Sequence, residues 1–136
     1  MVARAGGSGN RKSGKFHQGL IADLLAFAKG EFTLDERQSD GATLRQHIAI
    51  VAKQSGKIPE EYVFPDCPEQ LRYLWQLFID FCESRCNTGY GILPLQYAEI
   101  EAWSRLMRCP LTPWEVSVIK RIDGAFMQAQ MKEKKA

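Results

Sequence analysis

The segment EQLRYLWQLFIDFCESR, residues 69–85, gives the strongest indication of the fold. Its apolar side chains recur every three or four positions, the spacing at which residues share one face of an α-helix. That face is wider than half a turn, so we expect this helix to contact neighbours on more than one side and to form the centre of the fold. The apolar residues are Leu71, Leu74, Trp75, Leu77, Phe78, Ile79, Phe81 and Cys82.

The segments on either side of this helix predict further helices. Apolar residues at helical spacing mark residues 18–29, and Gly30 is the expected stop. Thr43 is placed to cap the first turn of a second helix, whose apolar stripe runs to Gly56. Residues 96–107 predict a helix with a buried stripe made of Ile100, Trp103, Leu106 and Met107.

The start of the last helix has the clearest local signal, LTPWE at residues 111–115. The Thr112 hydroxyl can accept a first-turn amide, and Glu115 can accept a bond from the Thr112 amide. Pro113 suits the first helical position, because no amide is needed there. We interpret residues 96–130 as an antiparallel helix pair that buries two tryptophans. The residues with expected structural roles are Trp103, Thr112, Pro113, Trp114 and Glu115.

Length and composition fit one small domain. The chain has 136 residues, of which 45% are apolar and 25% charged, the ordinary globular mixture. No segment of strand length alternates between apolar and polar residues, so we predict an all-α fold of about five helices in one small orthogonal or antiparallel domain. The domain is expected over residues 17–131, after a flexible, Gly-rich basic head (residues 1–16) and before a frayed charged tail (residues 132–136).

Charge is distributed in blocks, although the whole chain carries only +2. Residues 1–20 carry +4, residues 60–101 carry −6 and residues 102–136 carry +4. This mixture favours protein partners of mixed charge, including further copies of the chain, and argues against a nucleic-acid partner. No apolar run reaches the roughly 18 residues of a membrane span, so no membrane partner is expected. The first 20 residues lack a secretory signal, which favours an intracellular protein.

Residues that could carry chemistry are few and poorly placed. GNRKSGK, residues 9–15, has the spacing of a phosphate-binding loop, but Phe16 stands where the Mg²⁺-binding Ser or Thr belongs, and no strand precedes the segment. The cysteines form no CxxC pair, and neither histidine has a nucleophile or carboxylate placed by sequence to make it a base. We therefore predict no catalytic, cofactor or metal site and no enzymatic activity. The residues considered are His17, His47, Cys67, Cys82, Cys86 and Cys109.

The helix pair at residues 96–130 also permits a second hypothesis, a small helical DNA-binding or regulatory domain. A helix–turn–helix that reads DNA needs base-contacting side chains at the start of its second helix. Pro113, Trp114 and Glu115 occupy that start, and the carboxylate would repel phosphate. Packing of the pair within a core is the favoured interpretation.

Several stretches taken together resemble one protein family. They are TLRQHI (residues 43–48), GKIP (56–59), LWQLF (74–78) with Ser84 and Arg85, and, most specific, IEAWSRL (100–106) followed by LTPWE (111–115) and IKRID (119–123). In this order, over residues 42–128, the chain resembles the tail assembly chaperones of long-tailed bacteriophages, which are encoded just ahead of the tape-measure protein.

The resemblance implies a non-enzymatic assembly factor in the bacterial host cytoplasm. It would bind the tape-measure protein, keep it soluble and help to recruit tail-tube protein. Leu71, Leu74, Trp75 and Phe78 are the candidate partner-binding residues, because a helix so broadly apolar is difficult to cover on all sides within 136 residues. A minor structural protein of the virion, from the same gene cluster, is a third hypothesis.

Overall fold

The computed structural model describes the backbone of residues 10–85, 89 and 91–135, and side chains between residues 18 and 132. Over these residues the chain forms five α-helices and no strand, which confirms the predicted all-α fold. The helices are α1 (Asn10–Leu34), α2 (Leu44–Ser55), α3 (Arg72–Glu83), α4 (Tyr97–Leu106) and α5 (Pro113–Lys135). Two 3₁₀ turns, η1 (Glu60–Tyr62) and η2 (Glu69–Leu71), lie between α2 and α3.

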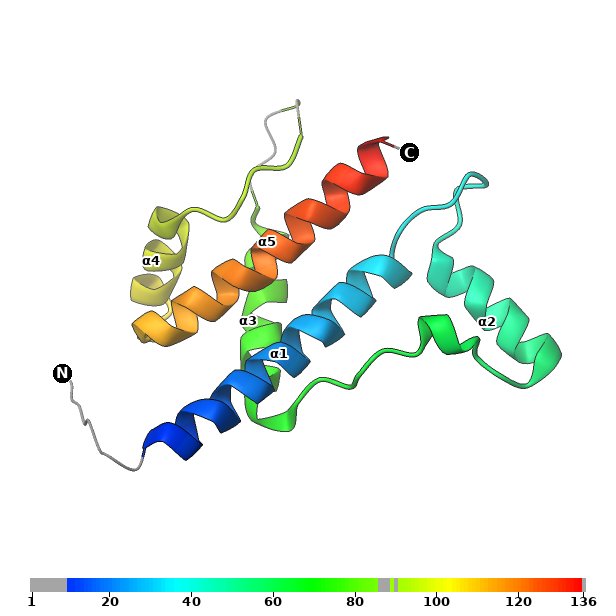
Figure 1. Ribbon diagram of the computed structural model, residues 1–136. Coiled ribbons are helices and arrows are strands. Elements are labelled where there is room, and N and C mark those ends of the chain that lie inside the picture. Colours follow the sequence, from blue (N-terminus) through cyan, green and yellow to red (C-terminus); the bar gives the residue numbers. More distant parts are fainter. Residues whose placement is uncertain (1–9, 86–88, 90, 136) are drawn as a thin grey trace.

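The two longest helices, α1 and α5, lie side by side, and α3 crosses behind them (Figure 1). α4 lies next to the first turns of α5 at one end of the molecule, and α2 lies at the other end, beyond the end of α1 (Figure 1). The chain that joins α2 to α3 returns along α1 (Figure 1). α3 therefore has neighbours on several sides, as the breadth of its apolar face predicts.

The core lies where α1, α3 and α5 meet. Its aromatic centre is Phe78 of α3, whose ring centroid lies 5.8 Å from that of Phe32 in α1 and 6.0 Å from that of Phe126 in α5. Phe81 of α3 extends the core to α4 through an edge contact with Trp103 at 5.0 Å. Burial of these faces stabilises the helices more than their propensities do. The buried core residues are Ile21, Leu24, Ala28, Cys67, Leu71, Leu74, Phe78, Phe81, Leu95, Ile100, Val118, Ile119 and Ile122.

Two helices begin with the predicted caps. The amide of Gln46 donates to the Thr43 hydroxyl at 3.2 Å, and the Thr43 amide donates to the Gln46 side chain at 2.8 Å. The amide of Glu115 donates to the Thr112 hydroxyl at 3.2 Å, and the Thr112 amide donates to the Glu115 carboxylate at 2.8 Å. Both starts satisfy first-turn amides reciprocally, and Pro113 is the first residue of α5, as expected.

Gly30 does not stop the first helix, contrary to the prediction. α1 continues to Leu34, and Gly30 is buried inside it. A Cβ atom at this position would lie 2.4 Å from Cγ of Phe64, which no real contact tolerates. The glycine is thus required by a close approach between the helix and a distant segment of chain rather than by a helix end.

The first and last helices extend further than the sequence predicts. α1 begins at Asn10, so residues 10–16 of the expected flexible head have helical backbone, whereas residues 1–9 lie outside the described part of the chain. At the other end α5 continues to Lys135, through most of the expected frayed tail, and Ala136 lies outside the described residues.

The helix pair α4–α5 is less buried than the sequence suggests. Trp103 is half-buried against the core, but Trp114 is 38% exposed, because it lies in the first turn of α5, before the buried part of that helix begins. Leu106 and Met107 are also exposed rather than part of a buried stripe. α4 ends there, and Arg108 turns the chain with a left-handed φ of 53°, so these two side chains lie beyond the core.

Candidate partner-binding surfaces

The four residues predicted to bind a partner lie mostly in the core. Leu71, Leu74 and Phe78 are each 3% exposed or less, so they have no surface to offer in this conformation. Trp75 is half-buried, and its ring contacts Phe27 edge-on at 5.1 Å. Most of the apolar face of α3 is covered by its own neighbours, whereas Trp75, Leu77, Ile79 and Cys82 are only partly buried.

A buried ion pair fixes the chain at the end of α3. Arg85 Nη2 lies 2.6 Å from Asp123 Oδ1 of α5, and the two side chains are only 5% and 3% exposed. Arg85 also donates to the carbonyl of Leu93 at 3.0 Å, while the other carboxylate oxygen of Asp123 accepts from the Leu95 amide at 2.9 Å. The guanidinium lies 4.7 Å from the centre of the Phe126 ring. The pair therefore holds α3, α5 and the segment before α4 together.

In the sequence, Arg85 and Asp123 stand out only as parts of separate motifs. The available signal was the position of Asp123, which follows Ile119 by four residues and so falls on the apolar stripe of its helix. A carboxylate on a buried face needs a partner, and an arginine at the end of a buried helix is one of the few that can supply it. The arrangement is structural, because both charges are used by the fold itself.

Glu115 of the α5 cap also joins α5 to α3. Its carboxylate accepts a hydrogen bond from the Tyr73 hydroxyl, and burial together with this bond raises the pKa of Tyr73 to about 12. Burial acts to raise the pKa of Glu115, but hydrogen bonds from Thr112 and Tyr73 outweigh it and hold the pKa below its usual value.

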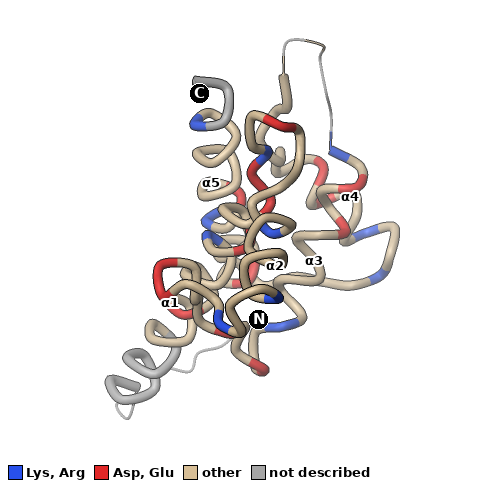
Figure 2. Tube along the Cα trace, turned by 90° about the vertical axis from the view of Figure 1, so that its right-hand side faces the viewer, with Lys and Arg blue, Asp and Glu red and all other residues tan. Residues whose placement is uncertain are grey.

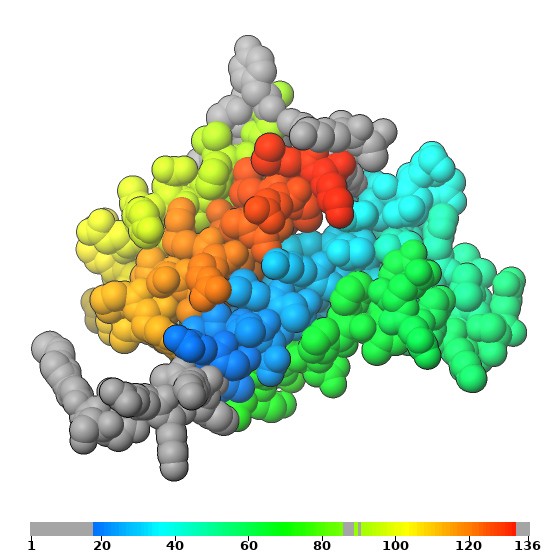
Figure 3. All heavy atoms as spheres, viewed as in Figure 1, coloured from blue at the N-terminus to red at the C-terminus, as the bar shows by residue number. Residues whose placement is uncertain are grey.

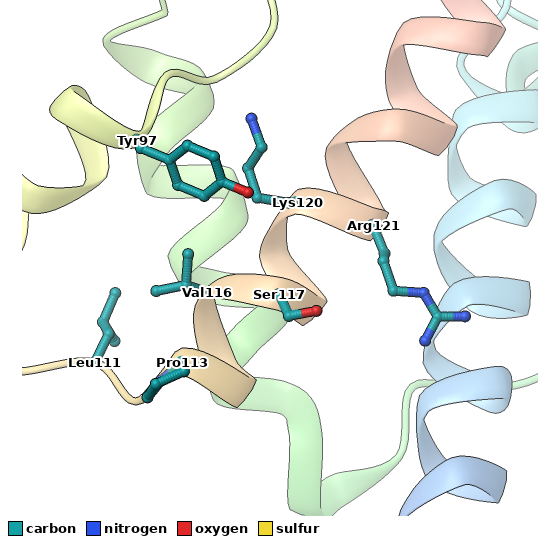
Figure 4. A pocket seen from close by; sticks show the side chains of 7 residues that line it. All are labelled: Tyr97, Leu111, Pro113, Val116, Ser117, Lys120 and Arg121. Atoms are coloured by element: carbon teal, nitrogen blue, oxygen red, sulfur yellow. The ribbon is translucent and has the colours of Figure 1, made fainter.

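A first open groove lies between the start of α4 and the first half of α5 (Figure 4). Its volume is about 580 Å³. The Lys120 ammonium lies 4.8 Å from the centre of the Tyr97 ring and donates to the carbonyl of Leu95, so this cation is already engaged at one side of the groove. The lining residues are Tyr97, Leu111, Pro113, Val116, Ser117, Lys120 and Arg121.

A second groove lies between α1 and residues 57–66, which we call the strap. The strap lies against α1 on the face shown in Figure 3, where it is green and α1 is blue. The groove has a volume of about 230 Å³, and most of its lining is apolar. The lining residues are Phe27, Gly30, Glu31, Leu34, Ile58, Tyr62, Val63, Phe64, Pro65 and Asp66.

The two grooves differ in charge. Lysine and arginine positions are interspersed with acidic ones over the described chain (Figure 2). The charged lining residues of the α4–α5 groove are nevertheless both basic, Lys120 and Arg121, whereas those of the strap groove are both acidic, Glu31 and Asp66. Different partner segments would suit the two surfaces.

The described residues hold no group of three or more side chains suited to a metal ion. Cys67, Cys82 and Cys109 are free thiols, and Cys86 lies outside the described residues. Residues 10–15 of the phosphate-loop-like stretch have helical backbone in α1 rather than the loop that such a motif requires. His47 lies 2.9 Å from Asp40 in an exposed pair.

Among the helices of the described chain, none has the length and apolar character that crossing a membrane requires.

Comparison with known proteins gives one match. The sequence fits the family model of a phage tail assembly chaperone over residues 51–128, from the second half of α2 into α5. Neither the curated proteins nor the solved structures that were searched give a match. Because the family match covers more than half of the chain and includes the strap, α3 and α4, this protein belongs to a family of phage tail assembly chaperones.

Proposed function

We propose that this chain acts without enzymatic activity in the cytoplasm of the bacterial host, where it binds the tape-measure protein and keeps it soluble until tail-tube protein assembles around it. Family membership over residues 51–128 is the observation that carries the proposal. The family is described as one of phage tail assembly chaperones, and the resemblance drawn from the sequence implies that the long tape-measure protein is what such a chaperone keeps soluble.

The surfaces of the chain support a binding role. Two open grooves with apolar linings lie on different parts of the molecule, one between α4 and α5 and one beside the strap. An amphipathic helix that places its apolar face in a groove is a common mode of helical recognition. The buried charged side chains of Arg85 and Asp123 pair with each other and hold the end of α3 to α5.

The proposal is tested by co-expression of the full chain with the tape-measure protein of the same phage. We expect soluble tape-measure protein to increase several-fold and a complex to survive size-exclusion chromatography. An unrelated helical protein of the same size is the control for general effects on expression. Equal aggregation with and without the chain, and no complex, would remove the tape-measure role. Salt-sensitive binding of the purified chain to random duplex DNA would instead support the DNA-binding hypothesis.

A further inference from the structure

The strap groove belongs to the least buried part of the molecule. Residues 36–66, which we call the arm, comprise a turn, α2 and the strap, and Ile48 is the only buried residue among them. Four large apolar side chains of the arm are exposed, two on α2 and two on the strap. They are Ile50, Val51, Ile58 and Val63, the last two 54% and 64% exposed. Of these four, Ile58 and Val63 line the strap groove together, and exposed apolar side chains that line an open groove are candidates for contact with a partner.

The length of the groove matches about two turns of a helix lying over it, with a few of that helix's apolar side chains entering the groove. Its floor on α1 extends from Phe27 to Leu34, which spans about 10 Å along the helix axis. Its other wall is the strap, held to α1 by Phe64, whose ring covers Gly30. Ile58 and Val63 of the strap also line the groove, and both are more than half exposed. About two turns of a partner helix would lie along this floor.

The charge around the groove favours one class of partner. Glu60, Glu61 and Asp66 are exposed on the strap, and none of them forms an ion pair with a described residue. Glu31 lies at the α1 side and is paired with Arg45. Lysine or arginine side chains beside the apolar face of a partner helix would meet the three unpaired carboxylates.

We propose that the strap groove binds an amphipathic helix whose apolar face is flanked by lysine or arginine, and that this helix is a segment of the tape-measure protein. That this helix comes from the tape-measure protein rests on the proposed function. The α4–α5 groove is the weaker candidate, because its Lys120 is already bonded to Leu95 and stacked on Tyr97. The strap groove instead leaves its apolar rim exposed and the carboxylates of Glu60, Glu61 and Asp66 without an ion pair to a described residue.

The structure also supplies a spectroscopic readout. Phe27 lines the groove, and its ring contacts Trp75 at 5.1 Å. An occupant that displaces Phe27 changes the surroundings of Trp75, so binding is expected to shift the emission of a chain in which Trp103 and Trp114 are replaced by phenylalanine. Of the four residues first predicted to bind a partner, Trp75 is thus the one that lies directly behind a groove.

The test uses the full chain and overlapping 25-residue peptides that tile the tape-measure protein (a length of about seven helical turns), with affinities from isothermal titration. We expect Val63→Asp to weaken the tightest peptide at least about tenfold, because it places a charge on the apolar rim. Glu60→Lys with Glu61→Lys is expected to weaken it several-fold and to reduce its dependence on salt. The matched controls lie at the other end of the molecule. They are Leu106→Asp, another exposed apolar position, and Glu101→Lys, another exposed carboxylate.

Each outcome decides between the claims. If no peptide binds the wild-type chain, the tape-measure role itself fails. If a peptide binds, and only Leu106→Asp weakens it, the strap groove is the wrong surface and the tape-measure role stands. If Val63→Asp abolishes a concentration-dependent dimer but leaves peptide affinity unchanged, the groove takes a second copy of the chain, which also overturns the proposal. The thermal unfolding temperature of each variant is measured as well, and a value equal to that of the wild type shows that the fold is retained.

Discussion

The bundle of α1, α3 and α5 and the arm at residues 36–66 differ in how far they bury their apolar side chains. In the bundle Leu24, Leu74, Ile119 and Ile122 are fully buried, and aromatic rings from all three helices meet around Phe78. The arm has good local structure, with a capping box at Thr43, but buries almost nothing. The bundle buries its apolar side chains against one another, whereas the arm leaves several exposed. This difference supports the proposal that the arm contacts a partner while the bundle holds the arm in place.

The arm is attached to the bundle at few points. Arg45 of α2 pairs with Glu31 and, at 3.2 Å, with Asp35 near the end of α1. Phe64 of the strap packs directly on Gly30. Exposed ion pairs contribute little to stability, so the arm is expected to open locally at a lower free energy than the bundle unfolds.

The largest contrast is expected from truncation of one apolar side chain in each region. Phe78→Ala removes the ring at the centre of the bundle and should lower the free energy of unfolding by about 3–5 kcal/mol. Ile50→Ala removes a 56% exposed side chain of the arm, and its effect should stay within about 0.5 kcal/mol. Urea titration of both variants measures the difference. Losses of similar size would contradict the division into bundle and arm.

A comparable loss is expected from the buried ion pair of the bundle. Asp123→Ala leaves the Arg85 guanidinium buried without its carboxylate, which should cost about 3–5 kcal/mol. Arg45→Ala breaks the exposed pairs of the arm and should cost less than about 1 kcal/mol. The double variant Arg85→Met with Asp123→Leu removes both buried charges and should recover most of the loss. An Asp123→Ala variant as stable as wild type would refute the structural role of the pair.

A smaller effect is expected where the two regions touch. In Gly30→Ala the new Cβ collides with the Phe64 ring, so the variant should lose about 1–3 kcal/mol and release the strap, despite the better helix propensity of alanine. Gly124→Ala is the matched control, because no atom lies within 4 Å of its added Cβ, and it should gain up to about 1 kcal/mol. Amide exchange over residues 57–66 would report the release. If Phe64→Ala does not relieve the defect of Gly30→Ala, the contact is not its cause.

The smallest effect belongs to the α5 cap. Thr112→Ala should cost about 1 kcal/mol, and Glu115→Ala less, with a double variant below the sum because the two side chains form one box. The folded-state pKa of Glu115 is below the usual 4.5. Its stabilising effect is therefore complete above the unfolded pKa and is lost as the pH falls through the folded pKa. Glu115→Gln should remove that part of the acid sensitivity in urea titrations, and an unchanged pH profile would contradict this role.

Sequence could predict what depends on neighbouring residues. The caps at Thr43 and Thr112 and the helical period around Phe78 are set within one or two turns, and all of them were predicted. Gly30 was predicted to end a helix, but a glycine is needed there because the Phe64 side chain packs against it, and Phe64 is far away in the chain. The Arg85–Asp123 pair was missed for the same cause.

The candidate surface was harder to predict than the fold. A broad apolar helix can be covered from inside or left for a partner, and periodicity does not distinguish the two. In the structure the surrounding helices bury Leu74 and Phe78 of α3. Exposed apolar side chains lie instead on the strap, at Ile58 and Val63. The family was predictable because the resemblance rests on short continuous stretches, and those between residues 56 and 123 lie within the matched residues 51–128.

Native-state hydrogen exchange of the full chain, measured with and without soluble tape-measure protein, tests directly whether the bundle is the stable region and the arm the partner-binding one. Without the partner, amides of α3 and the middle of α5 should exchange only through global unfolding, and amides of α2 and the strap should exchange through local opening at a clearly lower free energy. With the partner, protection should rise chiefly in the strap and along the facing turns of α1, between Phe27 and Leu34. Equal protection of arm and bundle in the free chain would contradict the difference between the two regions. New protection confined to α4 and the start of α5 would contradict binding at the strap groove.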